Sequence, residues 1–446
     1  MWYNPHENEL RLQKTVCCNE KELQKRDKEG IMSNLISNFK RKMKKRKVLK
    51  SQRKLEKNIN ATTDGITNYD ARLARHRRKV MIRTGITAGV VVVACVGAFM
   101  FVKYRSYHDY KVISTSDNED TVSAQYLELN GSLFKYSGDG VAVQDYEGNI
   151  LWNATYEMQN PIADECEGTI VVADQGGTNI RIFNKDGEIG QIETTLNIVK
   201  VKVAKQGVVA VILDGGEDTW IDFYASDGSL IAENQTRVDD PGYPLDIAVS
   251  EDGVLIMVSY QFVSGEETTS YVAFYNFATA GQNQIDNIVS GYQYQGVVIP
   301  QVEYLDSSTA VAFRDDGFSI FEGKQIPKES ANVQVEDEIV STFFDANNIG
   351  LVFKNDGKDK MYTMKVYNSS GHIKFEKSFN IAYTSIRMSD GHIVMNNDSQ
   401  VCVITTDGVE KFNGNIDEGS IDDFFRLGIN KYMLVMDNGL STIKFK

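Results

Sequence analysis

The amino-acid sequence predicts an all-β fold, an eight-bladed β-propeller, preceded by one transmembrane helix and a basic, partly helical or disordered cytosolic tail. Three observations lead to this prediction. Turn-forming glycines recur roughly every 40 residues, a second series of turns lies between them, and one uncharged apolar run separates a basic head from an acidic body. Tandem units of this length, built from short strands, are typical of propellers.

The first series of turns has the form of "DYEGN", "NKDGE" and "TTDGV", with glycine after an acidic or small residue. Tight hairpins need a positive φ, which Asp-Gly and Asn-Gly adopt at little cost. Successive glycines of this series are 39, 41, 53, 42, 48 and 37 residues apart. Its members are Gly148, Gly187, Gly228, Gly281, Gly323, Gly371 and Gly408.

The second series of turns lies between the earlier strands of each unit and has eight members. These are Gly131, Gly168, Gly207, Gly253, Ser308, Asn348, Gly391 and Asn430. Two interleaved series of turns, each joining short strands, describe four-stranded antiparallel sheets in tandem. Eight blades are therefore predicted, with seven as the alternative.

The segment 242–260, "GYPLDIAVSEDGVLIMVSY", shows how one unit is built. Its part "LDIAV" is predicted as the innermost strand of a blade and "VLIMVSY" as the next, with Gly253 in the turn. The apolar density of both fits strands that neighbouring blades cover on both faces. Asp252 is therefore interpreted as a turn former rather than a catalytic acid.

The ring of blades needs a closing strand, because an open first or last blade exposes a strand edge. The last unit ends inside its third strand, "LSTIKFK". We expect its missing outer strand to come from residues 109–115, "DYKVIST", which follow the apolar run. This pairing would fasten the ring close to the membrane.

The membrane span is predicted at residues 84–102, "TGITAGVVVVACVGAFMFV", an uncharged run between Arg83 and Lys103. At about 1.5 Å per residue, a helix of this length spans roughly 28 Å, close to the hydrocarbon thickness of a bilayer. A cleavable signal peptide is disfavoured, because the run exceeds the usual ~7–15 apolar residues and follows a very long leader.

Charge differs sharply on the two sides of this run. Residues 1–83 carry a net charge of +14 and residues 103–446 carry −27, which together give the net charge of −13. The positive-inside rule places the basic side in the cytosol. We expect a single-pass protein of the cell membrane, with residues 1–83 as the cytosolic tail, 103–123 as an outer juxtamembrane linker and 124–446 as the extracytoplasmic propeller.

Only two of the five cysteines, Cys166 and Cys402, lie beyond the apolar run. They fall in predicted blades 2 and 7, several blades apart. We therefore expect two free thiols, and an outer domain that is stabilised by its core rather than by disulfides.

Several stretches carry a family resemblance, among them "HRRKVMIR" (76–83), "YEMQNPIAD" (156–164), "GYPLDIAVSEDG" and "VAFYNFATAGQNQID" (272–286). From about Tyr69 onward the sequence resembles a family of uncharacterised, single-pass, membrane-anchored propeller proteins of Gram-positive, clostridia-type bacteria. This resemblance implies a propeller outside one membrane and no established activity. The blades are also similar to quinoprotein-like and WD40-like propellers, with Trp152 of "QDYEGNILWN" as the docking tryptophan.

No catalytic, cofactor or metal site is predicted. The chain has five histidines and no G-x-S-x-G, H-E-x-x-H or Walker A motif. A hydrolase needs a nucleophile beside a base, and a catalytic metal needs several convergent ligands. A quinoprotein-like enzyme is therefore the least favoured function, and no cofactor is expected.

The fourth unit is predicted to carry a surface for a partner. Its hairpin "SYQFVSGEETTSYVAFY" alternates apolar and polar residues past the normal blade length. An extended ribbon with aromatic residues beside a proline-containing connection is typical of a contact surface. The alternative is a hairpin that only covers its neighbour. The candidate partner-binding residues are Tyr243, Pro244, Tyr260, Phe262, Tyr292 and Tyr294.

The tail carries a second candidate contact region, "FKRKMKKRKVLKSQRKLEK" (39–57), in which 11 of the 18 residues from 40 to 57 are Lys or Arg. Anionic lipid at the cytosolic face is the preferred partner, because each basic residue near the surface contributes up to ~1 kcal/mol. Nucleic acid, bound through its phosphates, is the alternative. The candidate residues are Lys40, Arg41, Lys42, Lys44, Lys45, Arg46 and Lys47.

These features favour a non-catalytic binding or scaffold module for an extracytoplasmic protein or cell-wall polymer. The alternative is a transmembrane sensor that reports outside occupancy through the basic tail. Removing residues 1–68 would abolish the output of a sensor and would leave a scaffold intact.

Overall fold

The computed structural model describes residue 44 and residues 47–51, 66–117, 124–129, 131–237, 241–265, 267–355, 359–437 and 439–446. Within these ranges, residues 66–72, Asp117 and Ser264 are described by their backbone alone. The chain divides into two compact units, Met1–Met100 and Phe101–Lys446.

The apolar run lies in a long helix, α2 (Ile66–Tyr104), of 39 residues. Its part Leu73–Tyr104 is long and apolar enough to cross a membrane, as judged by length and composition. Apolar side chains of this part are exposed, for example Val93 at 72% and Phe99 at 64%. A helix with exposed apolar side chains of this kind is stable in hydrocarbon rather than in water, so this part is a candidate transmembrane span.

The basic segment of the tail is described only in part. Lys44 and Lys47 are helical and exposed. Five of its candidate residues lie outside the described ranges, namely Lys40, Arg41, Lys42, Lys45 and Arg46. Contact of this segment with lipid or nucleic acid stays a prediction.

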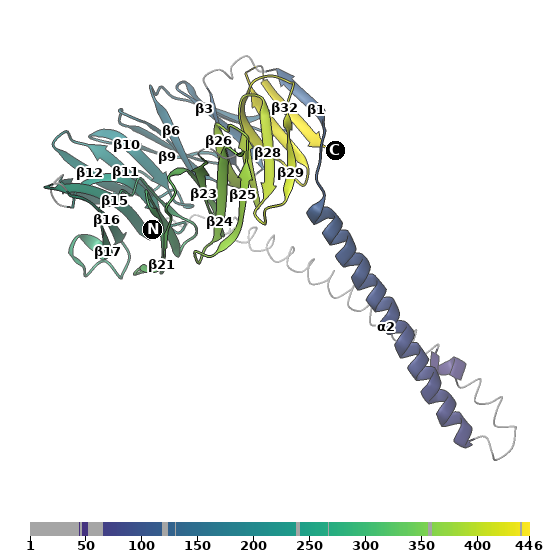
Figure 1. Cartoon of the computed structure of the whole chain (residues 1–446). Helices are drawn as coiled ribbons and strands as arrows, with labels where there is room; N and C mark the ends of the chain where they lie inside the picture. Colours follow the sequence, from purple (N-terminus) through teal and green to yellow (C-terminus); the bar gives the residue numbers. More distant parts are fainter. Residues whose placement is uncertain are drawn as a thin grey trace, which may run out of the picture. The chain divides into compact units, whose positions relative to one another are not determined.

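The second unit is a propeller of eight four-stranded antiparallel sheets (Figure 1). The all-β, eight-bladed prediction is confirmed, and the seven-bladed alternative is wrong. Each blade has four strands, named A to D from the innermost outward. The A strands contact one another from blade 2 to blade 5 and between blades 6 and 7.

The strands of the first four blades follow one another along the chain without interruption. Blade 1 is β2 (Gln125–Leu129), β3 (Ser132–Ser137), β4 (Gly140–Gln144) and β5 (Ile150–Thr155); blade 2 is β6 (Pro161–Cys166), β7 (Thr169–Asp174), β8 (Asn179–Asn184) and β9 (Gly187–Glu193). Blade 3 is β10 (Asn197–Val203), β11 (Val209–Asp214), β12 (Asp218–Tyr224) and β13 (Leu230–Arg237); blade 4 is β14 (Tyr243–Val249), β15 (Leu255–Ser264), β16 (Glu267–Asn276) and β17 (Ile288–Gln295), with the short helix η3 (Ile285–Asn287) before β17.

The next four blades continue this order, except that the last one takes a strand from the start of the unit. Blade 5 is β18 (Gln301–Tyr304), β19 (Thr309–Arg314), β20 (Gly317–Glu322) and β21 (Lys328–Gln334); blade 6 is β22 (Ile339–Asp345), β23 (Asn348–Lys354), β24 (Tyr362–Asn368) and β25 (Ile373–Phe379). Blade 7 is β26 (Ser385–Ser389), β27 (His392–Asn396), β28 (Gln400–Thr405) and β29 (Glu410–Asn415); blade 8 is β30 (Ile421–Arg426), β31 (Lys431–Met436), β32 (Gly439–Phe445) and β1 (Tyr110–Asp117).

Blade 8 is closed by β1, which pairs antiparallel with β32. The segment expected to supply the closing strand, 109–115, overlaps β1. The first strand of the unit pairs with its last strand, so the ring has no open blade. This pairing removes a strand edge to which another chain could otherwise bind.

The core lies between neighbouring blades. Strand β11 is buried along its first five residues, whereas the outer strand β13 is mostly exposed and has one buried residue, Thr236. Between blades 1 and 2, Trp152 stacks on Phe183 with ring centroids 5.9 Å apart, and its indole N–H donates to the carbonyl oxygen of Lys185 at 2.9 Å. Trp152 thus docks its own blade onto the next.

Residues 250–253, Ser-Glu-Asp-Gly, form the turn between β14 and β15. The Asp252 carboxylate accepts hydrogen bonds from the Ser250 hydroxyl at 2.8 Å and from the Val254 backbone N–H at 3.3 Å. Gly253 has φ of +63°, which suits glycine at this corner. The carboxylate therefore shapes the turn, in agreement with the sequence-based interpretation.

The two faces of the propeller carry different connections. The A–B and C–D turns lie on one face, called the anchor face because the segment 105–109 enters there. The Tyr107 N–H donates to the carbonyl of Lys411 at 2.7 Å, and the Lys446 N–H donates to the carbonyl of Asp109 at 2.8 Å. The B–C turns and the D–A connections lie on the opposite face, called the groove face.

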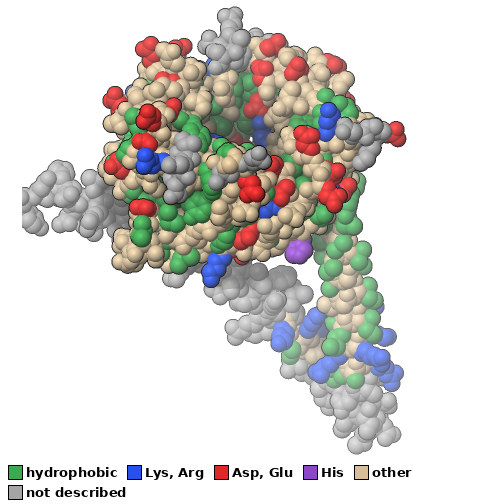
Figure 2. All heavy atoms as spheres, turned by 60° about the vertical axis from the view of Figure 1, so that its left-hand side comes forward, with side chains coloured by type: hydrophobic (Ala, Val, Ile, Leu, Met, Phe, Trp, Pro, Cys, Tyr) green, Lys and Arg blue, Asp and Glu red, His purple; other side chains and the backbone are tan. Residues whose placement is uncertain are grey.

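The charge pattern of the sequence is visible on both units. Figure 2 shows acidic side chains spread over the propeller and basic side chains gathered on the helix. The described cysteines of the propeller, Cys166 and Cys402, are free thiols in blades 2 and 7.

Candidate functional site

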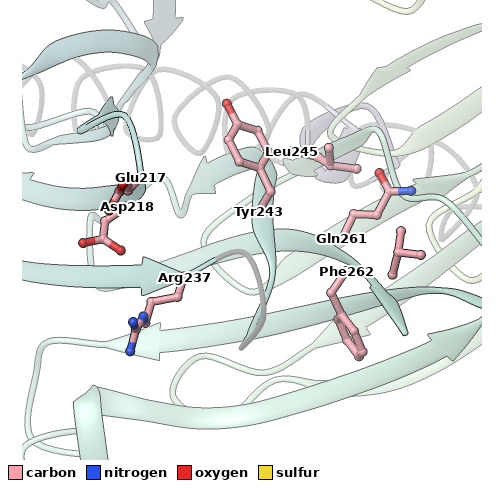
Figure 3. A pocket seen from close by; sticks show the side chains of 8 residues that line it. Glu217, Asp218, Arg237, Tyr243, Leu245, Gln261 and Phe262 are labelled. Atoms are coloured by element: carbon pink, nitrogen blue, oxygen red, sulfur yellow. The ribbon is translucent and has the colours of Figure 1, made fainter. Parts of the chain in front are cut away.

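An open groove of about 610 Å³ lies between blades 3 and 4 on the groove face (Figure 3). Blade 3 contributes the start of β12 and the end of β13, and blade 4 contributes the start of β14 and the end of β15. The groove is lined by Glu217, Asp218, Arg237, Tyr243, Leu245, Gln261, Phe262 and Val263.

The β15–β16 hairpin forms one wall of the groove because it is unusually long. Both strands have ten residues, and their pairing runs from Leu255 with Asn276 to Ser264 with Glu267. Among the described residues, the ladder between β14 and β15 ends at Tyr243 and Gln261. The end of β15 therefore extends beyond the inner strand and presents a backbone edge beside the groove.

Tyr243 is brought to the groove by a close approach of two backbones. Gly242 has φ of +117°, and a Cβ atom there would lie 2.6 Å from the carbonyl oxygen of Gln261. Only glycine fits at this point. Its N–H donates to the carbonyl of Arg237 at 3.1 Å, which ties the end of β13 to the start of β14. Tyr243 follows directly and lies between the carboxylates of blade 3 and Phe262 (Figure 3).

The wall from blade 3 carries the charges of the groove. Asp218 and Arg237 lie opposite each other across the β12–β13 ladder. The side-chain amide of Gln235 donates to Asp218 Oδ2 at 2.6 Å, which orients this carboxylate. Carboxylates and a guanidinium group on one wall, with aromatic and aliphatic side chains on the other, form an amphipathic site.

Two of the six predicted partner-binding residues, Tyr243 and Phe262, line the groove. Tyr243 is 41% exposed, and Val263, next to Phe262, is 67% exposed. Pro244 follows Tyr243 on β14, lies opposite Tyr260 in the ladder with β15, and is buried. It shapes the inner strand and is corrected from a contact residue to a structural one.

The position of Tyr260 also corrects the prediction, because this side chain is fully buried. Its hydroxyl lies 2.6 Å from the hydroxyl of Tyr275, and burial raises its pKa well above the usual value. Tyr260 and Phe262 point to the same face of their strand, because side chains alternate along it. Tyr260 packs with core residues of blade 3, such as Ile212, whereas Phe262 lies beyond them at the groove.

Tyr292 and Tyr294 pack between blades 4 and 5 and do not line the groove. The Tyr292 hydroxyl donates to the carbonyl of Pro327 at 3.0 Å, and its ring centroid lies 5.0 Å from that of Phe321. The Tyr294 hydroxyl donates to Glu329 Oε1 at 3.0 Å. Both side chains are partly buried in this interface, and their contact with a partner stays a prediction.

The blade 3 half of the groove was missed from the sequence. Arg237 and Asp218 lie on two strands of blade 3, whereas Tyr243 lies on a strand of blade 4. These residues line one groove because of how the two blades pack, which the sequence alone does not indicate. The acidic turn "DGGEDT" (214–219) was the one available signal, since it places carboxylates on a B–C turn.

A second polar cluster lies where the A strands meet. Lys202 Nζ in blade 3 lies 3.0 Å from Asp164 Oδ1 in blade 2 and 3.0 Å from Glu303 Oε2 in blade 5. Burial alone would lower the pKa of Lys202, but the two carboxylates raise it above the ordinary value. A lysine held in the charged form is neither a nucleophile nor a general base.

The neighbouring carboxylate of Asp246 is fully buried, and both of its oxygens have partners. It accepts the N–H groups of Ile247 and Val302 at 2.8 Å each and pairs with Lys200 Nζ at 2.5 Å. A cavity of about 360 Å³ beside this cluster is lined by Lys200, Lys202 and Asp164, among others. These ion pairs and hydrogen bonds connect the inner strands of blades 2 to 5 and stabilise their contact.

Other reactive groups of the propeller are suppressed by burial. Burial raises the pKa of the Cys166 and Cys402 thiols to about 12 each, which makes them weak nucleophiles. In the part of the chain that the structure describes, no group of three or more His, Cys, Asp or Glu residues is arranged to hold a metal ion.

Comparison with known proteins gives one family match. Residues 103–445 match the model of a family described as "Family of unknown function (DUF5711)". No protein with a curated description matches the sequence.

Solved structures with similar folds include the following three chains. BamB from Moraxella catarrhalis is 12% identical, with 76% of this chain and 100% of that chain covered and a TM-score of 0.44. A eukaryotic initiation factor is 10% identical, with 77% and 88% covered and a TM-score of 0.48. The WD40 domain of Neurospora crassa Pan2 is 12% identical, with 64% and 88% covered and a TM-score of 0.39.

Proposed function

The chain belongs to the DUF5711 family, whose function is unknown, and from this premise we propose that it is a membrane-anchored, non-catalytic binding module. In this proposal residues 1–83 are cytosolic, the apolar part of α2 spans the cell membrane, and the propeller lies outside. The propeller binds an extracytoplasmic protein through the groove between blades 3 and 4.

The groove is the observation that carries the proposal. It combines the exposed side chains of Tyr243 and Val263 and the half-buried ring of Phe262 with charged groups at Asp218 and Arg237. The end of β15 adds a backbone edge that extends past β14. Pockets for side chains beside an available strand edge are typical of sites for extended peptides. An extended segment of a protein is therefore the favoured ligand, and a cell-wall polymer is the alternative.

The placement of the groove supports a role in capture. The segment that leads out of α2 enters the propeller at the anchor face, through the contacts of Tyr107 and Asp109 with blades 7 and 8. The groove opens on the opposite face. A site on the face away from the point of attachment stays accessible to a large partner.

Site-specific photocrosslinking in native cells tests this function. A photoreactive amino acid at Val263, which is 67% exposed, should give a discrete crosslinked species. The matched control is the same amino acid at Met361, 46% exposed and also on the groove face, in blade 6. Tyr243→Ala should remove the species at Val263, since truncating an aromatic anchor typically costs 2 kcal/mol or more, roughly 30-fold in affinity.

Two results would decide against the groove. Equal crosslinking at Val263 and Met361 would indicate non-specific contact, and an unchanged species in Tyr243→Ala would place the partner elsewhere. A crosslinked species that loses mass on treatment with a cell-wall hydrolase would identify the ligand as a polymer.

A transmembrane sensor is the second candidate function, and one contact favours it. Lys411 Nζ in blade 7 donates to the carbonyls of Val102 at 3.0 Å and Lys103 at 2.7 Å, in the last turn of α2. The propeller is thus bonded directly to the end of the predicted span. Loss of cellular output on removal of residues 1–68, with the propeller still displayed, would favour the sensor over the scaffold.

A further inference from the structure

Exposed aliphatic side chains are concentrated on the anchor face. Beyond residue 105, the described part of the chain has fourteen exposed large hydrophobic side chains, and nine of them lie at C–D or A–B turns. The most exposed of these nine are Ile285 at 85%, Ile429 at 76%, Ile150 at 62% and Ile373 at 58%. The groove face has four.

Several of these side chains occupy equivalent positions in blades 1, 2, 3 and 6. The turn glycine of the C–D hairpin is followed within three residues by an aliphatic residue in "GNIL" (148–151), "GEI" (187–189), "GSLI" (228–231) and "GHI" (371–373). A hairpin turn that faces water normally carries polar residues there. An apolar residue repeated at the same end of several blades creates a rim of apolar surface, which marks a contact region.

The end of the predicted span lies at this same face. The last turn of α2, from Phe101 to Tyr104, belongs to the propeller unit. Its carbonyls at Val102 and Lys103 accept hydrogen bonds from Lys411, and Lys103 Nζ pairs with Asp407 Oδ2 at 2.8 Å. Asp407 lies in the C–D turn of blade 7 and Lys411 in β29, so the turns of this blade are held at the level where the span ends.

The aromatic residues of the linker fit that level. Tyr104 is 55% exposed, and Tyr107 lies beside Phe445 with ring centroids 6.2 Å apart. Arg105 lies over the Tyr107 ring, 5.1 Å from its centroid. Tyrosine and arginine are common at the boundary between hydrocarbon and headgroups.

We propose that the anchor face rests on the outer surface of the bilayer and that its aliphatic rim inserts at the level of the headgroups. This inference rests on the proposed membrane anchoring by α2. Contact of this kind hides the apolar rim from water and leaves the groove face free.

The charges of the face indicate which lipids it accepts. Its turns are acidic. Asp145, for example, accepts hydrogen bonds from the backbone N–H groups of Glu147 and Asn149 at 3.0 and 2.8 Å. The hydrogen bond from the Asn149 side chain is the main reason that the pKa of Asp145 is lowered. These carboxylates stay charged at neutral pH and repel anionic headgroups. The face therefore suits a zwitterionic surface better than an anionic one.

Tryptophan quenching in nanodiscs tests this proposal on the full-length chain. Ile373→Trp and Ile429→Trp are reconstituted into phosphatidylcholine discs with or without bromine on the acyl chains near the glycerol. The signal of the native tryptophans, measured on the unsubstituted chain, is subtracted. We expect brominated lipid to remove most of the added fluorescence of both variants and none of that of Met361→Trp on the groove face.

A variant inside the span separates this proposal from the one on which it rests. In discs whose lipid carries bromine near the ends of the acyl chains, Val92→Trp should be quenched wherever the propeller lies, because Val92 is near the middle of the predicted span in the apolar part of α2. If Val92→Trp is quenched while Ile373→Trp and Ile429→Trp are not, the anchor face is off the membrane and the inference is wrong. If Val92→Trp is also unquenched, the membrane anchoring itself fails.

Two further measurements exclude other occupants of the rim. Discs that hold two copies of the chain, with both rim variants unquenched, would show that a second copy covers the face. Replacing half of the phosphatidylcholine by phosphatidylglycerol should weaken the quenching of Ile373→Trp. Stronger quenching in anionic discs would contradict the charge argument.

Discussion

Tyr110, six residues after the end of α2, lies directly opposite Phe445, the second-last residue of the chain, in the ladder between β1 and β32. Phe445 is 1% exposed, and its ring centroid lies 4.0 Å from that of Phe412 in blade 7. The closure of the ring therefore joins the linker that follows α2, the last strand of the propeller and the neighbouring blade at one point.

Removing the Phe445 ring should open this closure. Phe445→Ala is expected to lower the free energy of unfolding by about 3–5 kcal/mol, because it leaves a cavity against Phe412 and Tyr432. Urea unfolding of the detergent-solubilised chain, followed by near-UV circular dichroism, measures the change. Phe262→Ala, at the rim of the groove, is the control and should cost clearly less; equal losses would contradict a special role for the closure.

The ion pairs at the centre should be sensitive to the loss of one partner. Lys202→Met is expected to destabilise the propeller by about 3–5 kcal/mol, because it leaves the carboxylates of Asp164 and Glu303 without their shared cation. Adding Glu303→Gln should recover part of this loss. The same urea titration, applied to the single and double variants, measures both effects.

The matched control for this variant is Lys205→Met. Lys205 is 54% exposed and pairs with Glu251 at 3.3 Å on the surface. Exposed pairs contribute little, typically about 0–1 kcal/mol. If both lysine variants lose the same stability, the central ion pairs do not stabilise the contact between the inner strands.

Acid should weaken the propeller through His392. Burial lowers the pKa of this imidazole below its ordinary value of 6.5. The folded state therefore favours the neutral ring, and this contribution is present above pH 6.5 and is lost as pH falls through the lower folded pKa. His392→Asn should reduce the loss of stability between pH 7.5 and pH 5, with exposed His372→Asn as the control for removing one imidazole. An unchanged pH dependence in His392→Asn would contradict the assignment.

The buried pair of tyrosines should affect stability and leave binding intact. Tyr260→Phe removes one of two hydroxyls that lie 2.6 Å apart and leaves the buried Tyr275 hydroxyl without that partner. We expect a loss of about 1–3 kcal/mol in the free energy of unfolding. Crosslinking at Val263 should be unaffected. Loss of crosslinking without loss of stability would return Tyr260 to the binding surface.

Local chemistry made the fold predictable from sequence. Gly148 and Gly253 mark hairpins whose φ values of +88° and +63° suit glycine, and Trp152 follows its turn at the position expected for docking. The strand that closes the ring was predictable because the last blade visibly lacks one. Each of these features depends on a few neighbouring residues.

The candidate site was only half predictable, because it depends on contacts between distant segments. Tyr260 and Phe262 have the same strand periodicity, and only the extent of blade 3 decides that one is buried and the other lines the groove. In the same way, Lys202 and Glu303 are 101 residues apart in the chain, and nothing in their local sequence indicates that they meet.

Labelling of single introduced cysteines on intact cells tests the central claim, an outward-facing groove on a membrane-anchored propeller. Val263→Cys lies at the groove and Lys47→Cys in the basic tail, and both positions are exposed. With the signal of the native cysteines subtracted, a membrane-impermeant maleimide should label Val263→Cys on intact cells and Lys47→Cys only after lysis. Labelling of Lys47→Cys on intact cells, with Val263→Cys protected until lysis, would contradict the account.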